Sequence, residues 1–466
     1  MAVVDEQGLV NFATTVRTYG RHLSQVELPN LVKLQTESYA RFLQAEVPQT
    51  RREKVGLQAL IDEIYPIKSY DQSISLEFLH YELGEPRYTP DECRALKLTY
   101  GAPLMVKLRL NRDSKALDED VYLGELPLMI GGGEFIINGA ERVIVNQLHR
   151  SPGIDFGFEV SADNRKLHQC WIIPERGSWI ELAVTKKETL SIRIDQSGKF
   201  SAMTFFRAMS PDLSTNEAII RQFYPTKKVK TGSDKAIANL KNRYAVSDVV
   251  DPDTGEILAE GGALISADIA KNIVKSKVKE IEVITEVADP IILNSLQEDP
   301  TTNQEEALER IYLRLRPGNP VSKEKASALF EEKFYDETRY RLGRVGRFRL
   351  NRKFGSEIEE NKQSLQPDDI KFAVDYLLTL RKPGSTALTD DIDHLGNRRV
   401  KTIDELVCDE LRKGFLKLKK NVQERMNLEE QPTPRNLINA KTISTAVAFF
   451  FGRGELSQVV DQTNPL

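Results

Sequence analysis

The 466-residue sequence is poor in the side chains that build metal centres and disulfide frameworks. It contains three cysteines and five histidines. Cys93, Cys170 and Cys408 lie far apart in sequence and form no Cys-x-x-Cys pair. This distribution argues against a disulfide framework and a zinc site, and it is typical of proteins that fold in a reducing compartment. The histidines form no His-x-His or His-Glu-x-x-His pattern, so they do not indicate a metalloenzyme either.

Long hydrophobic runs are also missing. No apolar run approaches the roughly 20 residues that a membrane-spanning helix requires. The first residues include Asp5 and Glu6 and no apolar stretch, so they do not predict a signal peptide. Hydrophobic residues make up 40% of the chain and charged residues 29%, which is near the composition of ordinary globular proteins. We therefore expect a cytoplasmic chain of two or three domains, each with its own core.

The formal net charge of −4 gives no sign of a polyanionic partner, but local basic segments determine phosphate affinity. Residues 339–353 contain no acidic residue. The segment predicts either a phosphate contact or ion pairs with acidic residues elsewhere in the chain, because like charges repel. A second basic run, 413–420, lies on a predicted helix, where a solvated face is an equally good interpretation. The cations of the first segment are Arg339, Arg341, Arg344, Arg347, Arg349, Arg352 and Lys353.

Hydrophobic periodicity predicts an α+β chain. Alternating apolar residues from Leu104 to Leu110 indicate a half-buried strand, and Asn138-Gly139 indicates a tight turn. A hydrophilic stretch at 226–243 is typical of a connector or surface insertion, whereas the apolar segment 437–452 should pack against a core. Strands are predicted over 73–78, 104–110, 135–137, 143–145, 169–174, 179–185 and 190–195. Helices are predicted over 29–45, 305–316, 323–332, 367–380 and 402–426.

No group of side chains has the spacing of a catalytic site. The run Gly131-Gly132-Gly133 lacks the Gly-Lys-Ser/Thr that a phosphate-binding loop needs, so a plain turn is favoured. Asp390, Asp391 and Asp393 are of the type that binds Mg²⁺, but an acidic cluster beside arginines is more typical of a salt-bridged loop. Taken alone, the residues predict no active site.

Three groups of motifs carry a resemblance to a known family. The first comprises GELPLM at 124–129 and the segment 135–153, which contains FIING, ERVIV and QLHRSPG. The second comprises LRPG at 315–318 and elements of 339–351. The third comprises DDIDHLGNRR at 390–399, NAK at 439–441 and residues 456–466. In this order they resemble the β subunit of bacterial RNA polymerase, from about Tyr19 to the end of the chain.

The resemblance implies an α+β, multidomain fold in which a discontinuous protrusion domain holds an inserted lobe domain. The sequence is then expected to stop within the next region, the fork. The implied regions are an N-terminal arm (1–19), the first protrusion segment (20–135), the lobe (136–399, with a surface insertion at about 225–285), the second protrusion segment (400–450) and the start of the fork (451–466).

The resemblance also implies a function, namely a component of DNA-directed RNA polymerase, the nucleotidyltransferase that transcribes DNA into RNA from ribonucleoside triphosphates. This region would grip downstream DNA, the non-template strand and the edge of the RNA–DNA hybrid channel. The catalytic Mg²⁺ is expected on the partner β′ subunit, so this chain would have no catalytic residue, metal or cofactor and would be inactive alone. The implied partners are the β′, α dimer, ω and σ subunits, both DNA strands and nascent RNA, in the cytoplasm near the nucleoid and with no membrane.

In the family, a pocket between lobe and protrusion receives a flipped non-template base. A tryptophan face stacks on any base, a carboxylate accepts hydrogen bonds from the guanine edge, and arginines hold the strand backbone. For the tryptophan, packing in the lobe core is the competing interpretation. The matching residues are Arg150, Trp179, Ile392, Asp393 and Arg398. The basic segment adds Arg339, Arg344 and Arg347 as expected DNA contacts, because the lobe lies beside downstream DNA in the family.

The end of the chain resembles half of the pocket that binds rifamycin antibiotics beside the hybrid. The chain differs from the family at Val459 and Val460, where family members have larger apolar side chains. The loss of that apolar contact area costs several kcal/mol of ligand-binding free energy. The other half of the pocket belongs to later regions of the subunit, so drug binding by this chain is not expected. The matching residues are Arg142, Leu456, Gln458 and Asp461.

A function of another class stays open, namely a stand-alone fragment that binds nucleic acid or polymerase without synthesis. The two interpretations differ in assembly. A split fragment should restore activity when the remaining β, β′ and α chains are supplied, whereas a decoy should inhibit.

Overall fold

The computed structural model describes residues 30–461 except 113–114, 232–234, 253, 277 and 430, together with the backbone of β1 (Val3–Val4) and β2 (Val10–Asn11). The predicted N-terminal arm therefore lies almost wholly outside the described residues. Across the described residues, no helix is both long enough and apolar enough to cross a membrane.

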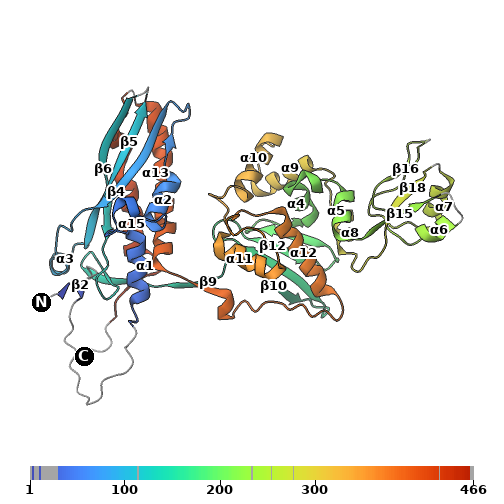
Figure 1. Cartoon of the computed structure of the whole chain (residues 1–466), viewed down its shortest axis with the longest axis horizontal. Helices are drawn as coiled ribbons and strands as arrows, with labels where there is room; N and C mark the ends of the chain where they lie inside the picture. The colour runs from blue at the N-terminus through green and yellow to red at the C-terminus, as the bar shows by residue number, and fades with distance from the viewer. Residues whose placement is uncertain are drawn as a thin grey trace, which may run out of the picture. The chain divides into compact units, whose positions relative to one another are not determined.

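The chain forms two compact units, each containing helices and strands (Figure 1). Unit 1 comprises residues 1–149 and 400–466, and unit 2 comprises residues 150–399. The α+β multidomain class is confirmed, and a continuous unit is inserted into a discontinuous one. Whether these units are the protrusion and the lobe of the family stays a prediction.

The compact units divide at 149/150, whereas the resemblance implies a boundary between protrusion and lobe at 135/136, which stays a prediction. The cause is a three-stranded sheet in unit 1, in which β8 pairs on one side with β7 and on the other with β20. Phe135 and Ile137 are buried in the core of unit 1, which holds this hairpin there. The strands are β7 (Phe135–Ile137), β8 (Ala140–Ile144) and β20 (Ser457–Val459).

The predicted Asn138-Gly139 turn joins β7 to β8. Both residues have positive φ, 52° and 79°, as a two-residue hairpin of this type requires. Gly139 is needed for a second reason, since a Cβ on it would lie 2.7 Å from the Cα of Lys97. The turn prediction is confirmed.

Unit 1 is built on a four-stranded antiparallel sheet whose strands follow one another in sequence order. Along β5 every second residue is buried, including Leu104, Val106 and Leu108, as the alternation predicted. Helices from both chain segments supply the rest of the core. The strands are β3 (Ile67–Lys68), β4 (Ile74–Leu83), β5 (Gly101–Arg112) and β6 (Lys115–Pro127). The helices are α1 (Lys33–Leu43), α2 (Gly56–Ile64), α3 (Pro90–Leu96), α13 (Ile403–Leu428), α14 (Pro434–Leu437) and α15 (Ala440–Arg453).

Unit 2 is built on a five-stranded antiparallel sheet, again in sequence order. Its core combines this sheet with helices that follow it in the chain. The strands are β10 (Gly153–Val160), β11 (Lys166–Ile173), β12 (Ile180–Val184), β13 (Leu190–Ile194) and β14 (Phe200–Ser201). The helices are α4 (Ala202–Met209), α5 (Asn216–Phe223), α8 (Ile291–Glu298), α9 (Gln304–Leu315), α10 (Lys323–Phe334), α11 (Gly343–Phe354) and α12 (Pro367–Arg381). Two short strands that belong to neither unit as a whole, β9 (Gln147–Arg150) and β19 (Arg398–Lys401), pair with each other.

The insertion expected at about 225–285 is a small folded module with its own core. Its first and last strands pair antiparallel, with Thr226 opposite Ile284. Ala245, Ile265 and Ile273 are fully buried in the module core. The elements are β15 (Thr226–Lys230), α6 (Lys235–Leu240), β16 (Val249–Val250), β17 (Ile257–Ala259), α7 (Ala267–Lys275) and β18 (Glu280–Ile284).

Candidate nucleic-acid interface

A buried carboxylate in unit 2 organises the surroundings of Arg150. Asp155 lies on β10 and its side chain is fully buried. One carboxylate oxygen accepts a hydrogen bond from Nη2 of Arg150 at 2.8 Å, and the other accepts one from Nη2 of Arg349 at 2.9 Å. Both arginine side chains are only 19% exposed. Because charge-assisted pairs of this kind are strong and directional, Arg150 is held in one place.

The two tryptophans of the chain flank Arg150. Its guanidinium carbon lies 4.8 Å from the ring centroid of Trp171 and 5.5 Å from that of Trp179. Both distances are within the range of cation–π attraction. Trp171 stands on β11 directly opposite Asp155. The guanidinium is therefore fixed by a carboxylate and lies near both indole rings.

Trp179 is 42% exposed, which excludes the interpretation that it is a core residue of unit 2. It immediately precedes β12, and its backbone N–H donates to the carboxylate of Asp195 at 2.8 Å. The half-exposed indole is thus anchored through its backbone and offers an aromatic surface to a ligand. Asp155 and Trp171 were missed by sequence reasoning. The presence of only two tryptophans, eight positions apart around a turn, was the available signal.

The loop 390–397 is tied to the same network. Asp390 accepts hydrogen bonds from the backbone N–H of Phe156 at 2.9 Å and from Nζ of Lys353 at 2.7 Å. Asn397 accepts one from Nη2 of Arg349 at 3.0 Å and donates to the carbonyl of Asp391 at 2.7 Å. The predicted salt-bridged role is confirmed for Asp390. Across the described ranges, no three His, Cys, Asp or Glu side chains gather as a metal site.

This anchoring leaves Ile392 and Asp393 exposed. The backbone N–H of Asp393 donates to the carboxylate of Asp391 at 2.9 Å. Among the residues that the structure describes, the carboxylate of Asp393 itself has no hydrogen-bond or ion-pair partner, so it is available as an acceptor. Arg398 is half-buried at the start of β19, next to Asn397, whose carbonyl accepts from Ser151 N–H at 2.9 Å. The loop is thereby joined to the residue that follows Arg150.

The basic segment contains one residue for which the DNA-contact prediction is wrong. Arg347, on α11, is fully buried. It donates to Asp369 at 2.6 Å, to the carbonyl of Lys362 at 2.8 Å and to that of Ser364 at 2.7 Å. The side chain does not reach the surface, so Arg347 has a structural role.

Most other cations of the segment also have carboxylate partners. Arg339 pairs with Glu332, Arg341 with Glu175 at 3.2 Å, and Arg344 with Glu360 at 3.5 Å. Together with Asp369, Asp155 and Asp390, these carboxylates pair with six of the seven cations of the segment, which supports the ion-pair interpretation. Arg339 and Arg344 nevertheless remain exposed, and surface ion pairs of this kind are weak enough to exchange for a phosphate.

In unit 1, the residues that resemble the rifamycin pocket lie on neighbouring strands. β20 pairs with β8, which places Gln458 opposite Val143. Nη1 of Arg142 donates to the carbonyl of Ser457 at 3.4 Å, and the carbonyl of Leu456 accepts from Val145 N–H at 2.9 Å. The structure thus brings Arg142, Leu456 and Gln458 together, while Asp461 is exposed at the end of the described residues.

Two family models match the chain. The model described as RNA polymerase beta subunit matches residues 30–131, in unit 1. The model described as RNA polymerase Rpb2, domain 2, matches residues 263–401, of which all but the last two lie in unit 2. Both matches fall within the range that carried the resemblance.

Curated relatives named DNA-directed RNA polymerase subunit beta match nearly the whole chain. The protein of Rhodopirellula baltica is 55% identical over 460 residues, which is 97% of this chain and 37% of the relative. That of Protochlamydia amoebophila is 41% identical over 453 residues (95% and 36%), and that of Chlamydia muridarum is 39% identical over 453 residues (95% and 36%). The chain thus spans little more than a third of the length of these relatives. Identity of this extent, with both family models in order, means that the chain belongs to the family of bacterial RNA polymerase β subunits and corresponds to their amino-terminal region.

Proposed function

We propose that this chain is a component of the β subunit of a DNA-dependent RNA polymerase, in which it holds DNA while partner chains carry out nucleotidyl transfer. Family membership supports the polymerase assignment. The observation that carries the DNA-holding role is the half-exposed indole of Trp179 beside the immobilised guanidinium of Arg150.

In this proposal, an unpaired base of the non-template strand stacks on Trp179. Stacking of a base on an aromatic ring is worth about 1–3 kcal/mol and is tolerant of sequence. The unpartnered carboxylate of Asp393 accepts hydrogen bonds from the N–H groups of guanine, which adds a preference that a phosphate contact lacks. Arg150 is held by Asp155, so it orients the stacking surface and reaches one side of the nucleotide. Ile392 and Arg398 complete the pocket.

The exposed Arg339 and Arg344 would contact phosphates of downstream DNA. Each phosphate neutralised releases counterions, so affinity should fall with salt. The magnesium ion of the reaction is expected on the β′ subunit, and no step of catalysis is assigned to residues of this chain. The β′, α, ω and σ subunits and the nascent RNA are its proposed partners, and the cytoplasm is its proposed location.

The base pocket is tested with single-stranded oligonucleotides that differ at one central base. We expect Trp179→Ala to weaken binding about 5-fold or more whatever the central base, because stacking is lost. We expect Asp393→Ala to remove the preference for guanine while overall affinity changes little. Fluorescence anisotropy of labelled oligonucleotides measures both effects. Asp163→Ala, which removes an exposed carboxylate of the same unit, is the matched control.

An equal loss for all four bases on Asp393→Ala would contradict the readout of guanine. A second candidate function is that of a stand-alone fragment that binds polymerase without synthesis. A reconstitution experiment distinguishes it from the proposed function. The chain is mixed with a fragment that carries the rest of a related β subunit, with β′ and with α. Restored RNA synthesis supports the proposed function, whereas inhibition of an intact polymerase supports the decoy.

A further inference from the structure

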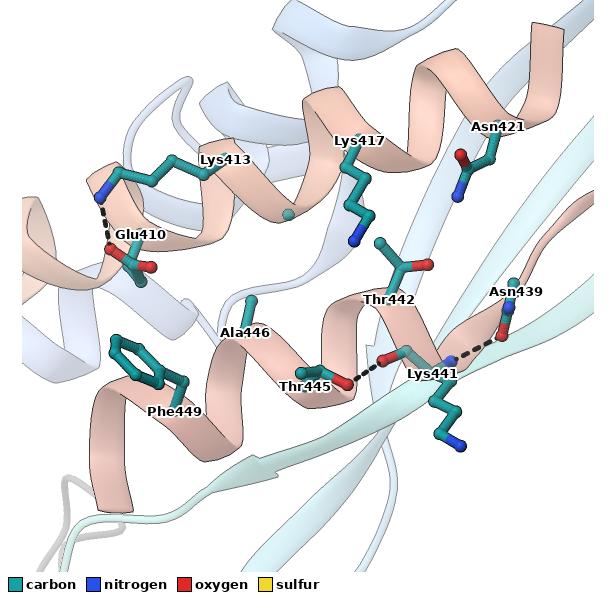
Figure 2. A pocket seen from close by; sticks show the side chains of 11 residues that line it. Glu410, Lys413, Lys417, Asn421, Asn439, Lys441, Thr442, Thr445, Ala446 and Phe449 are labelled. Carbon is teal, nitrogen blue, oxygen red and sulfur yellow. Dashed lines mark hydrogen bonds and ion pairs between the residues drawn. The ribbon is translucent and has the colours of Figure 1, made fainter. Parts of the chain in front are cut away.

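A groove of about 510 Å³ lies between α13 and α15 of unit 1 (Figure 2). The helices approach closely at one point, since a Cβ on Gly414 would lie 3.1 Å from the Cβ of Ala446. Longer side chains stand on both sides of this contact. On α13, Lys413, Lys417 and Asn421 follow one another at intervals of four residues, so they share one face of the helix.

The groove is positively charged. Three lysines line it, Lys413, Lys417 and Lys441, against a single carboxylate, that of Glu410. Glu410 accepts from Nζ of Lys413 at 2.8 Å and so compensates only that residue. Within the described ranges, the ammonium groups of Lys417 and Lys441 have no hydrogen bond or ion pair. Figure 2 shows Lys417 extending from α13 toward Thr442 on α15. The unbalanced charge favours an anionic ligand.

The groove also contains a half-exposed aromatic side chain. Phe449 lies on α15 at the far end from Lys441 and is 54% exposed. With a rise of 1.5 Å per residue, Lys441 and Phe449 lie about 12 Å apart along the helix, and successive lysines on α13 about 6 Å apart. Cations at such spacing beside an exposed ring are typical of sites that bind unpaired nucleic-acid strands, where phosphates meet lysines and bases stack on rings.

We propose that this groove binds a short stretch of single-stranded nucleic acid, with a phosphate at Lys417 and a base on the ring of Phe449. The proposal rests on the proposed function in that a polymerase exposes unpaired strands, but it concerns a different surface in a different unit. An acidic segment of a partner protein is the competing occupant. It would use the lysines equally but would have no use for a flat aromatic face.

The test measures the binding of labelled oligothymidylate and oligouridylate to the full chain by anisotropy at increasing KCl. All chains carry Trp179→Ala, so that the base pocket of unit 2 does not mask the groove. Adding Lys417→Glu should weaken binding about 10-fold or more at low salt and reduce the slope of log affinity against log salt by about 1. Adding Phe449→Ala should weaken binding about 5-fold or more without changing that slope. The tighter of the two oligonucleotides identifies the strand as DNA or RNA.

Two matched controls accompany these variants. Lys33→Glu makes the same change of charge on α1, where Lys33 pairs with Glu37 at 3.4 Å. Phe158→Ala removes a similarly exposed ring from unit 2. Equal losses of affinity for Lys417→Glu and Lys33→Glu would overturn the proposal. It would also be overturned if Phe449→Ala left oligonucleotide binding unchanged and an acidic peptide displaced the oligonucleotide completely. The effect of Trp179→Ala by itself is measured separately. The proposal for the groove can therefore be contradicted while the proposed function is still supported.

Discussion

Asp155 is a side chain on which the arrangement of the base pocket depends. Replacing it with asparagine leaves Arg150 and Arg349 close together without the carboxylate that joins them. We expect Asp155→Asn to lower the free energy of unfolding by about 3 kcal/mol, at the low end for breaking a buried pair because the arginines retain some contact with water. Arg150 should also move relative to the indoles.

The movement of Arg150 can be observed directly, because both tryptophans of the chain lie within 5.5 Å of it. The intrinsic tryptophan emission of Asp155→Asn should therefore differ from that of the unsubstituted chain. Arg349→Met should change the emission in the same direction, although Arg349 is not one of the predicted DNA contacts. Unchanged emission in both variants would show that the network does not position Arg150. Arg344→Met, on the same helix as Arg349, serves as the control.

A second prediction for a single residue concerns Arg347. Arg347→Met leaves the carboxylate of Asp369 and two backbone carbonyls without their donor in a fully buried place. We expect a loss of about 3–5 kcal/mol in urea unfolding, against less than about 1 kcal/mol for the exposed pair broken by Arg344→Met. The double variant Arg347→Met/Asp369→Leu should recover part of the loss, because no charge is then left buried, although the backbone N–H of Gln366 loses its acceptor Asp369.

The loss in Arg347→Met should also depend on pH. Burial already raises the pKa of Asp369 above its ordinary value, and Arg347 opposes that shift. Without Arg347, Asp369 in the folded state should bind a proton still more tightly relative to the unfolded state. The stability of the variant should then fall as pH rises from the ordinary aspartate range toward neutrality. A pH-independent difference from the unsubstituted chain would contradict this account.

At the scale of elements, the inserted module is expected to be separable from the rest of unit 2. Thr226 and Ile284 are opposite each other in an antiparallel pair, so their Cα atoms are about 4.5–5.5 Å apart. A two-residue turn can therefore replace residues 227–283. We expect the shortened chain to unfold cooperatively, with a loss of about 1–3 kcal/mol because Val246 of the module is buried in the core of unit 2. Circular dichroism during thermal unfolding measures this, and a non-cooperative melt would show that the module is indispensable.

Element prediction from sequence succeeded where apolar residues set the pattern. The helix predicted at 402–426 is α13 (Ile403–Leu428), and the strand predicted at 190–195 is β13. Helix α11 was not predicted because its buried face lacks an apolar stripe. That face consists of Gly343, Gly346, Arg347 and Leu350, and an arginine with a buried partner cannot be distinguished from a surface arginine in the sequence.

At the scale of the whole molecule, the two units should differ in their ability to fold alone. Among the residues that the structure describes, the buried members of the core of unit 2 all lie between Ile154 and Leu377. We expect the fragment 150–399 to unfold in one cooperative transition and to keep the tryptophan emission of the full chain, as differential scanning calorimetry and fluorescence would show.

Unit 1 takes its core from both chain segments. Phe415 and Phe451 of the second segment pack in the same core as Phe42 and Phe135 of the first. The fragment 1–149 should therefore lack a stable fold, because it cannot bury these faces. A cooperative melt of that fragment would contradict this expectation.

The sequence by itself determined the family through the resemblance of its motifs. It also determined the α+β class, the alternation of the sheet strands and the Asn138-Gly139 turn, because these depend on local order and periodicity. It also placed Arg150 and Trp179 in one candidate site by resemblance. Only the tertiary structure decided which cations are buried, that Asp155 joins Arg150 to Arg349, and that α13 and α15 leave a lysine-lined groove. Those features depend on which distant residues meet in space, and the free energy of a charge is set by its partner and its exposure rather than by its neighbours in sequence.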